Sequence, residues 1–111
     1  MKDCLFCNIV DGFISAKKVL ENGNILAFED IDPQAPVHVL IIPKKHITTI
    51  NDVNRADKEV CGEILIAAKE IAKILKINES GYRLVFNTND DGGQTVYHIH
   101  MHLLGGRKLK W

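Results

Sequence analysis

The sequence has no long apolar run, no excess of either charge and too few cysteines for a disulfide framework. No stretch approaches the length of about 18 apolar residues that a membrane-spanning helix needs, so we expect no membrane partner and a cytoplasmic location. Lysine plus arginine and aspartate plus glutamate number 14 each, so the net charge is 0 and no field attracts nucleic acid. Three cysteines, an odd count, argue against a secreted disulfide scaffold.

The length of 111 residues and the composition, 46% hydrophobic and 25% charged, are those of one globular domain. We find no repeat, low-complexity tract or linker at which a second domain would begin. We therefore expect residues 1–111 to form a single domain with one site. A chain this short often gains stability by pairing with a second copy.

Hydrophobic patterning predicts an α+β fold. Asn22-Gly23 is typical of a tight hairpin turn between two strand-like runs. From Asn54 the period changes, and apolar residues from Val60 to Leu75 recur at the three- and four-residue steps of one helical face, with the helix ending before Gly81. We expect an antiparallel sheet with one long helix on one face and a short N-terminal helix. The predicted elements are a helix over 5–10, strands over 18–21, 25–30 and 37–42, the long helix, and strands over 82–87 and 97–104.

Three histidines alternate in the run His98-Ile99-His100-Met101-His102. Successive side chains of a strand point to opposite faces, so three imidazoles would share one face of the expected strand. Neutral imidazole is a common zinc ligand, so a metal site is one interpretation. The other is covalent catalysis, in which an unprotonated imidazole nitrogen attacks phosphorus and forms a phosphohistidine. The histidines alone do not decide between the two.

The loop that leads to these histidines combines Gly92 and Gly93 with the amide of Gln94 and the hydroxyl of Thr95. Backbone N–H groups that are not covered by side chains can cradle an anion. A solvated β-turn is the ordinary alternative for an Asp-Gly-Gly sequence. The position of the loop directly before three histidines favours the anion-binding interpretation.

The stretch from Gly93 to Arg107, GQTVYHIHMHLLGGR, resembles the signature of the histidine-triad (HIT) superfamily. Within that superfamily, Asp30–Pro36 (DIDPQAP) and Ile42–Ile47 (IPKKHI) resemble the HINT branch, the purine nucleoside phosphoramidases. The likeness runs in the same order from about Cys4 to Trp111. It implies a HIT-like fold and an enzyme that acts on nucleotides.

The resemblance implies that His100 attacks the α-phosphorus of a nucleoside phosphoramidate. An amine leaves, and water then releases the nucleoside monophosphate. In the family, the backbone carbonyl of the first triad histidine, here His98, holds the second ring nitrogen of the nucleophile. His102 corresponds to the histidine that contacts the phosphate and leaving group, and we assign it the donation or relay of a proton. The family counterpart of His38 lies close to the phosphate, although a lone strand histidine is more often structural.

The resemblance also implies a nucleoside site. Asp30 corresponds to the carboxylate that binds both ribose hydroxyls, for which two acceptor oxygens are well suited. Asn87, Gly93, Gln94 and Thr95 would complete the phosphate and ribose contacts. The purine would stack in an apolar slot, although without the family its members read simply as core residues: Leu5, Phe6, Ile9, Phe28 and Ile31.

Cys4 and Cys7 lie three residues apart at the start of the first helix, so both sulfurs can face one side. His46 and His98 would complete a tetrahedral set of two cysteines and two histidines. Some bacterial members of the superfamily are similar here and hold zinc at these positions. We therefore expect a structural zinc ion and no catalytic metal, the alternative being two reduced thiols without metal.

Several interpretations remain open on the sequence. The family pairs as a homodimer through its long helix and the nearest strand, and we expect the same here. A dinucleoside polyphosphate hydrolase of the same superfamily would share the nucleophile and differ in the leaving group. A metallohydrolase whose three triad histidines bind zinc, and a nucleotide-binding protein with weak catalysis, are answers of other classes.

Overall fold

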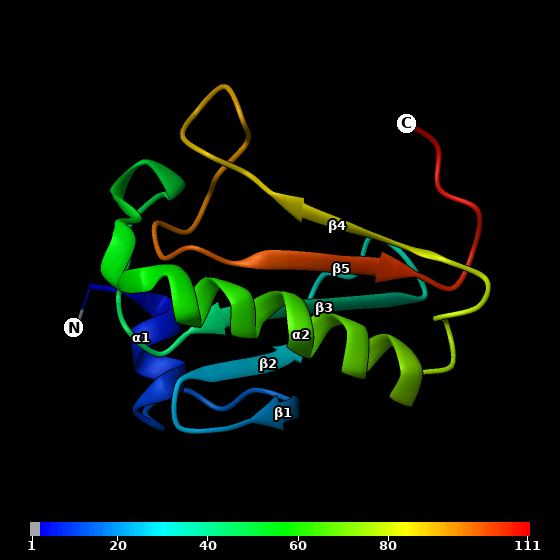
Figure 1. Cartoon of the computed structure of the whole chain (residues 1–111), viewed down its shortest axis with the longest axis horizontal. Coiled ribbons are helices and arrows are strands. Elements are labelled where there is room, and N and C mark those ends of the chain that lie inside the picture. The colour runs from blue at the N-terminus through cyan, green and yellow to red at the C-terminus, as the bar shows by residue number, and fades with distance from the viewer. Residues whose placement is uncertain (1–2) are drawn as a thin grey trace.

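A computed structural model describes residues 3–111, so the first two residues of the expected domain lie outside it. The fold is a five-stranded antiparallel sheet in the order β1-β2-β3-β5-β4, which confirms the α+β prediction. Figure 1 looks onto the face of the sheet that the long helix α2 covers, with β1 and β4 at the two edges. The elements are α1 (Leu5–Val10), β1 (Lys18–Glu21), β2 (Ile25–Glu29), β3 (Val37–Pro43), α2 (Lys58–Ile74), β4 (Tyr82–Phe86) and β5 (Met101–Gly105). Among residues 3–111, no helix has both the length and the apolar character needed to cross a membrane.

The β1–β2 hairpin forms at the predicted turn. The side-chain carbonyl of Asn22 accepts hydrogen bonds from the backbone N–H groups of Asn24, at 2.8 Å, and Ile25, at 3.0 Å. Such a local side-chain bond closes a turn without any help from the rest of the fold, which explains why the hairpin could be predicted from a dipeptide. The register of β2 on β3 follows, with Leu26 opposite Ile42 and Phe28 opposite Leu40.

The centre of the sheet is covered on both faces. Successive residues of β2 and β3 therefore alternate between two apolar clusters, one on each face. One cluster joins Ile25 and Ile41 to the inner face of α2, where Ile64 and Ile71 are fully buried. The second cluster, which includes Leu26, Phe28, Leu40 and Ile42, packs against Cys4, Phe6, Cys7 and Ile9 of the α1 segment. Each fully buried Ile or Leu side chain contributes about 1.5–3 kcal/mol, so a helix as short as α1 is held by this packing and not by its own hydrogen bonds.

Helix α2 begins after a capped 3-10 turn. Asn54 accepts from the N–H of Ala56, while the carboxylate of Asp57 accepts from the N–H of Asn54. The helix ends at Ile74 because Lys76 adopts a left-handed φ of 61° and the N–H of Ile77 reaches back to the carbonyl of Ala72. Leu75 of the predicted apolar face thus lies just past the end and is partly exposed.

The last strand is shorter than predicted. It covers Met101–Gly105 and not residues 97–104, so His98 and His100 precede it. Pro43, at the end of the neighbouring strand β3, has no N–H to extend the ladder, and its carbonyl lies 2.7 Å from His98 Nε2. The N–H of Ile99 donates instead to the carbonyl of Ile47. The expectation that one regular strand carries all three histidines is therefore wrong.

Candidate active site and metal-ligand cluster

A pocket of about 330 Å³ lies between α1, the end of β2 and the histidine segment. Its apolar side comes mainly from α1 and β2, and its polar lining includes two carboxylates, two hydroxyls and two imidazoles. The residues of the expected nucleotide site that line it are Leu5, Phe6, Ile9, Phe28, Asp30, Ile31, Thr95, His100 and His102. The structure thus brings most of the predicted site together from three distant parts of the chain.

The imidazole of His100 is fixed in one tautomer. Its Nδ1 lies 2.9 Å from the backbone carbonyl of His98, which can only accept, so Nδ1 carries the proton and donates. Nε2 therefore keeps its lone pair. The ring is 6% exposed and packs edge-on against Phe6, with centroids 5.1 Å apart. Burial lowers the pKa of His100, so the lone pair is not lost to a proton at neutral pH.

The imidazole rings of His38 and His102 are joined by a hydrogen bond. The backbone N–H of Gln34 donates to His38 Nδ1 over 3.0 Å, so the proton of neutral His38 sits on Nε2. That N–H donates to His102 Nδ1 at 2.9 Å and has Asp30 Oδ2 3.5 Å away. His102 Nδ1 is thus an acceptor, and its own proton sits on Nε2. The N–H of Gln34 thus fixes the tautomer of His38, and His38 in turn fixes the tautomer of His102.

His102 is neutral in the resting protein. Burial, and then the neighbouring His100 and His38, lower its pKa to about 4. Burial also lowers the pKa of His38, although the carboxylates of Asp30 and Asp32 oppose this shift. The two imidazoles that line the pocket are therefore uncharged, and the acidic side chains in its lining are Glu29 and Asp30.

Three residues expected to contact phosphate or ribose instead order the loop before the histidines. The amide of Gln94, which is 6% exposed, donates to the carbonyls of Thr48 and Val96 and accepts from the N–H of Asn89. Asn87 donates to the carbonyl of Gly92. Gly93 has a φ of +81°, and neither it nor Asn87 or Gln94 lines the pocket.

Sequence reasoning missed two kinds of contributor. The connector after α1 supplies Ile14, Ser15 and Ala16 to the pocket rim, and no motif marked them. The backbone N–H of Gln34 and the carbonyl of Pro43 fix the tautomers of His38 and His98, and these two contacts leave no residue-type signal in the sequence. The carbonyl of His98 was expected from the resemblance, and it lies 2.9 Å from Nδ1 of His100.

Cys4, Cys7, His46 and His98 form a cluster that could hold a metal ion, with ligand atoms all within 4.8 Å of one another. His98 Nδ1 lies 3.3 Å from Cys4 Sγ and 3.5 Å from Cys7 Sγ, and His46 Nδ1 lies 3.3 Å from Cys7 Sγ. A zinc tetrahedron with ordinary bond lengths has sulfur–nitrogen edges of about 3.6 Å. His98 donates its Nε2–H to Pro43, so Nδ1 presents a lone pair to the sulfurs.

The thiols also suit a cation. Burial, together with the adjacent Cys4, raises the pKa of Cys7 to about 11. Two thiolates at this spacing need a positive ion to neutralise them, and a coordinating metal deprotonates thiols outright. The donor set and its chemistry therefore fit a metal of zinc's type.

The histidines of the pocket do not converge on a single ion. Asp30, His38 and His102 also lie close enough to be ligands, but the N–H of Gln34 forces the proton of His38 onto Nε2, where a metal would bind. The Nδ1 of His98 faces the cysteines, and the Nδ1 of His100 donates to a carbonyl. This arrangement argues against a metallohydrolase built on the three triad histidines.

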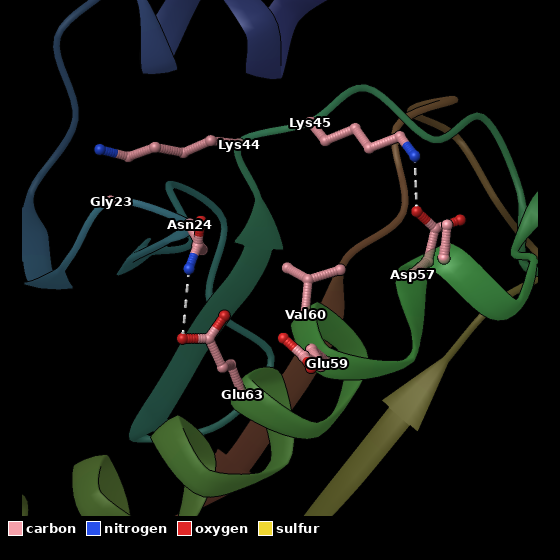
Figure 2. A pocket seen from close by; sticks show the side chains of 9 residues that line it. Gly23, Asn24, Lys44, Lys45, Asp57, Glu59, Val60 and Glu63 are labelled. Carbon is pink, nitrogen blue, oxygen red and sulfur yellow. Dashed lines mark hydrogen bonds and ion pairs between the residues drawn. The ribbon is translucent and has the colours of Figure 1, made fainter.

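A second hollow, on the α2 side of the sheet, is lined by two lysines and three carboxylates (Figure 2). Lys45 pairs with Asp57 at 2.6 Å, and Asn24 donates to Glu63 at 3.4 Å, as the dashed lines in the figure mark. Lys44 pairs with Glu21 of β1 at 2.8 Å. These contacts tie the start of α2 to the hairpins and leave both lysines neutralised, so the hollow reads as structural.

The family model described as "HIT domain" matches residues 12–109. A purine nucleoside phosphoramidase from Escherichia coli (strain K12) is 47% identical over 108 residues, which are 97% of this chain and 91% of that protein. A HIT family hydrolase from Legionella pneumophila Philadelphia 1 has a solved structure that is 62% identical, with a TM-score of 0.96, covering 98% of this chain and 97% of that one. The structure of a histidine triad protein from Clostridium difficile also gives 0.96, at 39% identity and with 99% and 96% coverage. The likeness therefore extends over nearly the whole described fold.

The depressed pKa of His102 predicts an acid-sensitive fold. Since the folded pKa is about 4 and the unfolded value is near 6.5, only the unfolded chain binds this proton between those two pH values. The contribution of His102 to the free energy of unfolding should therefore rise from pH 4 to about 6.5 and stay constant above. Urea unfolding over this range, with His102→Gln as a variant of shallower slope, measures it. An NMR titration that places the His102 midpoint near 6.5 would contradict the assignment.

Proposed function

The chain belongs to the HIT domain family, and on this premise we propose that it is a purine nucleoside phosphoramidase that works through a nucleotidyl-His100 intermediate. The observation that carries the proposal is the single tautomer of His100, whose free Nε2 belongs to a buried, neutral ring in the pocket wall. A nucleophile needs that lone pair at neutral pH, and no metal ion is required to create it.

In the first step, His100 Nε2 forms a bond to the α-phosphorus while the P–N bond breaks. The electron pair of that bond leaves with the amine nitrogen, which must gain a proton. We assign this proton to Nε2 of His102. The ring must first take up a second proton from solvent on Nδ1, because a neutral imidazole that gave up Nε2–H while Nδ1 accepts from His38 would be left as an imidazolate. The hydrogen bond from His38 to this nitrogen is given up when that proton enters. The resting pKa of about 4 is low because burial disfavours the imidazolium, and a substrate phosphate beside the ring would raise it. Binding would thus charge the acid only when there is a leaving group to protonate.

In the second step, water attacks the phosphorus of the nucleotidyl-histidine. Neutral His102 accepts the proton of the water, the P–N bond to His100 breaks, and the electron pair returns to Nε2. The nucleoside monophosphate leaves, His102 returns its second proton from Nδ1 to solvent and accepts from His38 again, and both histidines regain their starting states. Two displacements at phosphorus give overall retention, because each inverts it.

The nucleoside would lie along the pocket from α1 toward His102. The apolar side formed by Leu5, Phe6, Ile9, Phe28 and Ile31 would hold the purine by stacking, and Asp30 would accept from both ribose hydroxyls. Thr95 would donate to the phosphate. We propose that Asn87, Gly93 and Gln94 act by shaping the loop that presents Thr95, since their side chains or backbone are engaged with that loop.

The phosphoramidase assignment is preferred to dinucleoside polyphosphate hydrolysis because a relative at 47% identity bears the former name. The DIDPQAP connector, which carries Asp30 and Gln34, points the same way. A binding protein with weak catalysis would share the pocket, so the covalent step separates these two possibilities.

We also propose that Cys4, Cys7, His46 and His98 hold a structural zinc ion. Zinc would supply charge neutralisation for the two thiolates and would fix α1 to the segment before β5. Packing would hold the two segments together as well, since the ring of Phe6, which lies between the two cysteines in the sequence, contacts the rings of both His98 and His100.

A homodimer is the third part of the proposal. The outward side of α2 exposes Leu65, Ile66 and Ile74, and the edge strand β4, which pairs only with β5, exposes Leu84 and Phe86. An unpaired edge beside exposed apolar side chains favours isologous pairing with a second copy of the chain.

The covalent step is testable by mass spectrometry. After incubation with adenosine 5′-phosphoramidate and a rapid acid quench, the wild-type protein should carry a nucleotidyl group on His100. His100→Ala should lose the adduct and reduce turnover by about a thousandfold or more, because no other free imidazole nitrogen in the pocket replaces it. Glu79→Ala, in the exposed turn between α2 and β4, should behave as wild type. Full activity in His100→Ala would rule out the mechanism.

Metal content tests the zinc site independently of activity. Anaerobically purified protein should contain about one zinc ion per chain, and cobalt substitution should give the visible spectrum of tetrahedral cobalt with thiolate ligands. Cys7→Ser should lose both signals, whereas Cys61→Ser, which alters a partly buried thiol of α2, should keep them. Protein without stoichiometric metal under these conditions would remove the site from the proposal.

Light scattering tests the dimer. Wild-type protein at micromolar concentration should have twice the chain mass, and Phe86→Glu should shift it toward the monomer because a charge would be buried at the interface. Phe13→Glu alters a residue that is 81% exposed outside α2 and β4, so it should leave the mass unchanged. A monomeric wild-type protein would overturn the expectation.

A further inference from the structure

Arg107 is connected to the catalytic imidazoles by three consecutive hydrogen bonds. Its Nη2 donates to the carbonyl of Gln34 at 3.0 Å, and the N–H of Gln34 donates to His38 Nδ1 at 3.0 Å. His38 Nε2 then donates to His102 Nδ1 at 2.9 Å. We propose that Arg107 is a positioning residue that, by holding the backbone of Gln34, fixes the tautomers of His38 and His102. The inference rests on the proposed function for its catalytic meaning.

The N–H of Gln34 is the step that decides the tautomers. An imidazole nitrogen that accepts a hydrogen bond cannot also carry a proton. With this N–H in place, neutral His38 is protonated on Nε2, and His102 presents Nε2–H to the pocket. If the peptide rotated away, His38 could place its proton on Nδ1 instead. The Nδ1 of His102 would then lose its donor, and its proton could move from Nε2 to the wrong side of the ring.

The segment that contains Gln34 has little support of its own. It lies between β2 and β3, outside both strands. Within it, the N–H of Asp32 donates to Asp30 at 2.8 Å and the Gln34 amide donates to the carbonyl of Asp32 at 2.9 Å. Its contacts to β3 lie at Asp30, whose N–H donates to the carbonyl of His38 at 3.0 Å and whose Oδ2 lies 3.5 Å from His38 Nε2. Arg107 lies in the segment that follows β5, the strand that carries His102. The guanidinium therefore ties the donor of the first imidazole to the strand of the second.

Gly106 explains how Arg107 reaches this segment. It has a φ of +91°, and a Cβ at this position would lie 2.8 Å from Pro36 Cβ. The chain after β5 can therefore lie against Pro36 only with glycine at this position. Arg107 is the next residue, so its side chain lies against the connector between β2 and β3, where it contacts Gln34.

Arg83 provides a comparison because it makes a similar bond to the carbonyl of Lys110 and not to the carbonyl of Gln34, although both arginines line the same surface hollow. Its Nη1 donates to the carbonyl of Lys110 at 2.8 Å, and its guanidinium lies 5.8 Å from the ring centre of Trp111. Both arginines are on the surface and both hold a backbone carbonyl. A general effect of removing a surface arginine would appear in both variants, whereas a positioning effect would appear only at Arg107.

The experiment combines ring NMR with steady-state kinetics on Arg107→Ala, Arg107→Lys and Arg83→Ala. Long-range nitrogen–proton spectra of histidine-labelled protein should show His38 in wild type with an unprotonated Nδ1 and a protonated Nε2. In Arg107→Ala the two His38 nitrogen shifts should move toward each other. The kcat for a phosphoramidate should fall by about three- to tenfold, with KM nearly unchanged. Arg107→Lys should fall between the two, and Arg83→Ala should match wild type.

An unchanged His38 spectrum in Arg107→Ala would overturn the inference, as would equal losses in Arg107→Ala and Arg83→Ala. The ring spectra do not depend on any substrate. If the wild type fails to cleave phosphoramidates while Arg107→Ala still shifts the His38 signals, the proposed function is wrong and the positioning role stands.

Discussion

The hydrogen bond from the ring of His98 to the carbonyl of Pro43 is the contact on which both candidate sites depend. It is 2.7 Å long and fully buried, and it leaves His98 Nδ1 as a lone pair that faces the two cysteine sulfurs. The backbone carbonyl of the same residue accepts from His100 Nδ1 and so keeps Nε2 of that ring unprotonated. The ring of His98 therefore serves the metal-ligand cluster, and the backbone carbonyl of the same residue serves the pocket. A buried polar group that is satisfied on every side is held rigidly, because each lost bond would cost its full desolvation.

His98 can serve both sites because the sheet is covered on both faces. Helix α2 covers one face and supplies most of the apolar contact, which leaves the other face free for α1, the cysteines and the histidines. Phe6 joins them, since its ring touches Phe28 of the apolar wall as well as His98 and His100. The pocket and the metal-ligand cluster therefore lie on the face of the sheet opposite α2, and the core beneath α2 stabilises the fold. The residues of the two sites are free to serve their chemistry.

Local signals in the sequence were enough for most elements. Asn22-Gly23 closes its own turn, and the apolar period of α2 matches its buried face at Ile64 and Ile71. The length of β5 could not be predicted in this way, because the alternation of side chains continues through residues 97–100 while the pairing of β3 with β5 ends at Ile41 and Met101. Gln94 illustrates a second limit. Its amide was expected at the phosphate, but three backbone partners within the protein engage it, and a sequence does not reveal such distant carbonyls.

The strand order also has a consequence for how the protein is made. β5 lies between β3 and β4, although it is the last strand in the chain. Until residues 101–105 have left the ribosome, β3 presents an open edge and β4 has no partner. Pairings this distant in sequence close slowly, and an apolar open edge in the meantime is prone to aggregation. The segment that completes the sheet also delivers the triad histidines, so an incomplete chain has neither a finished core nor a reactive site.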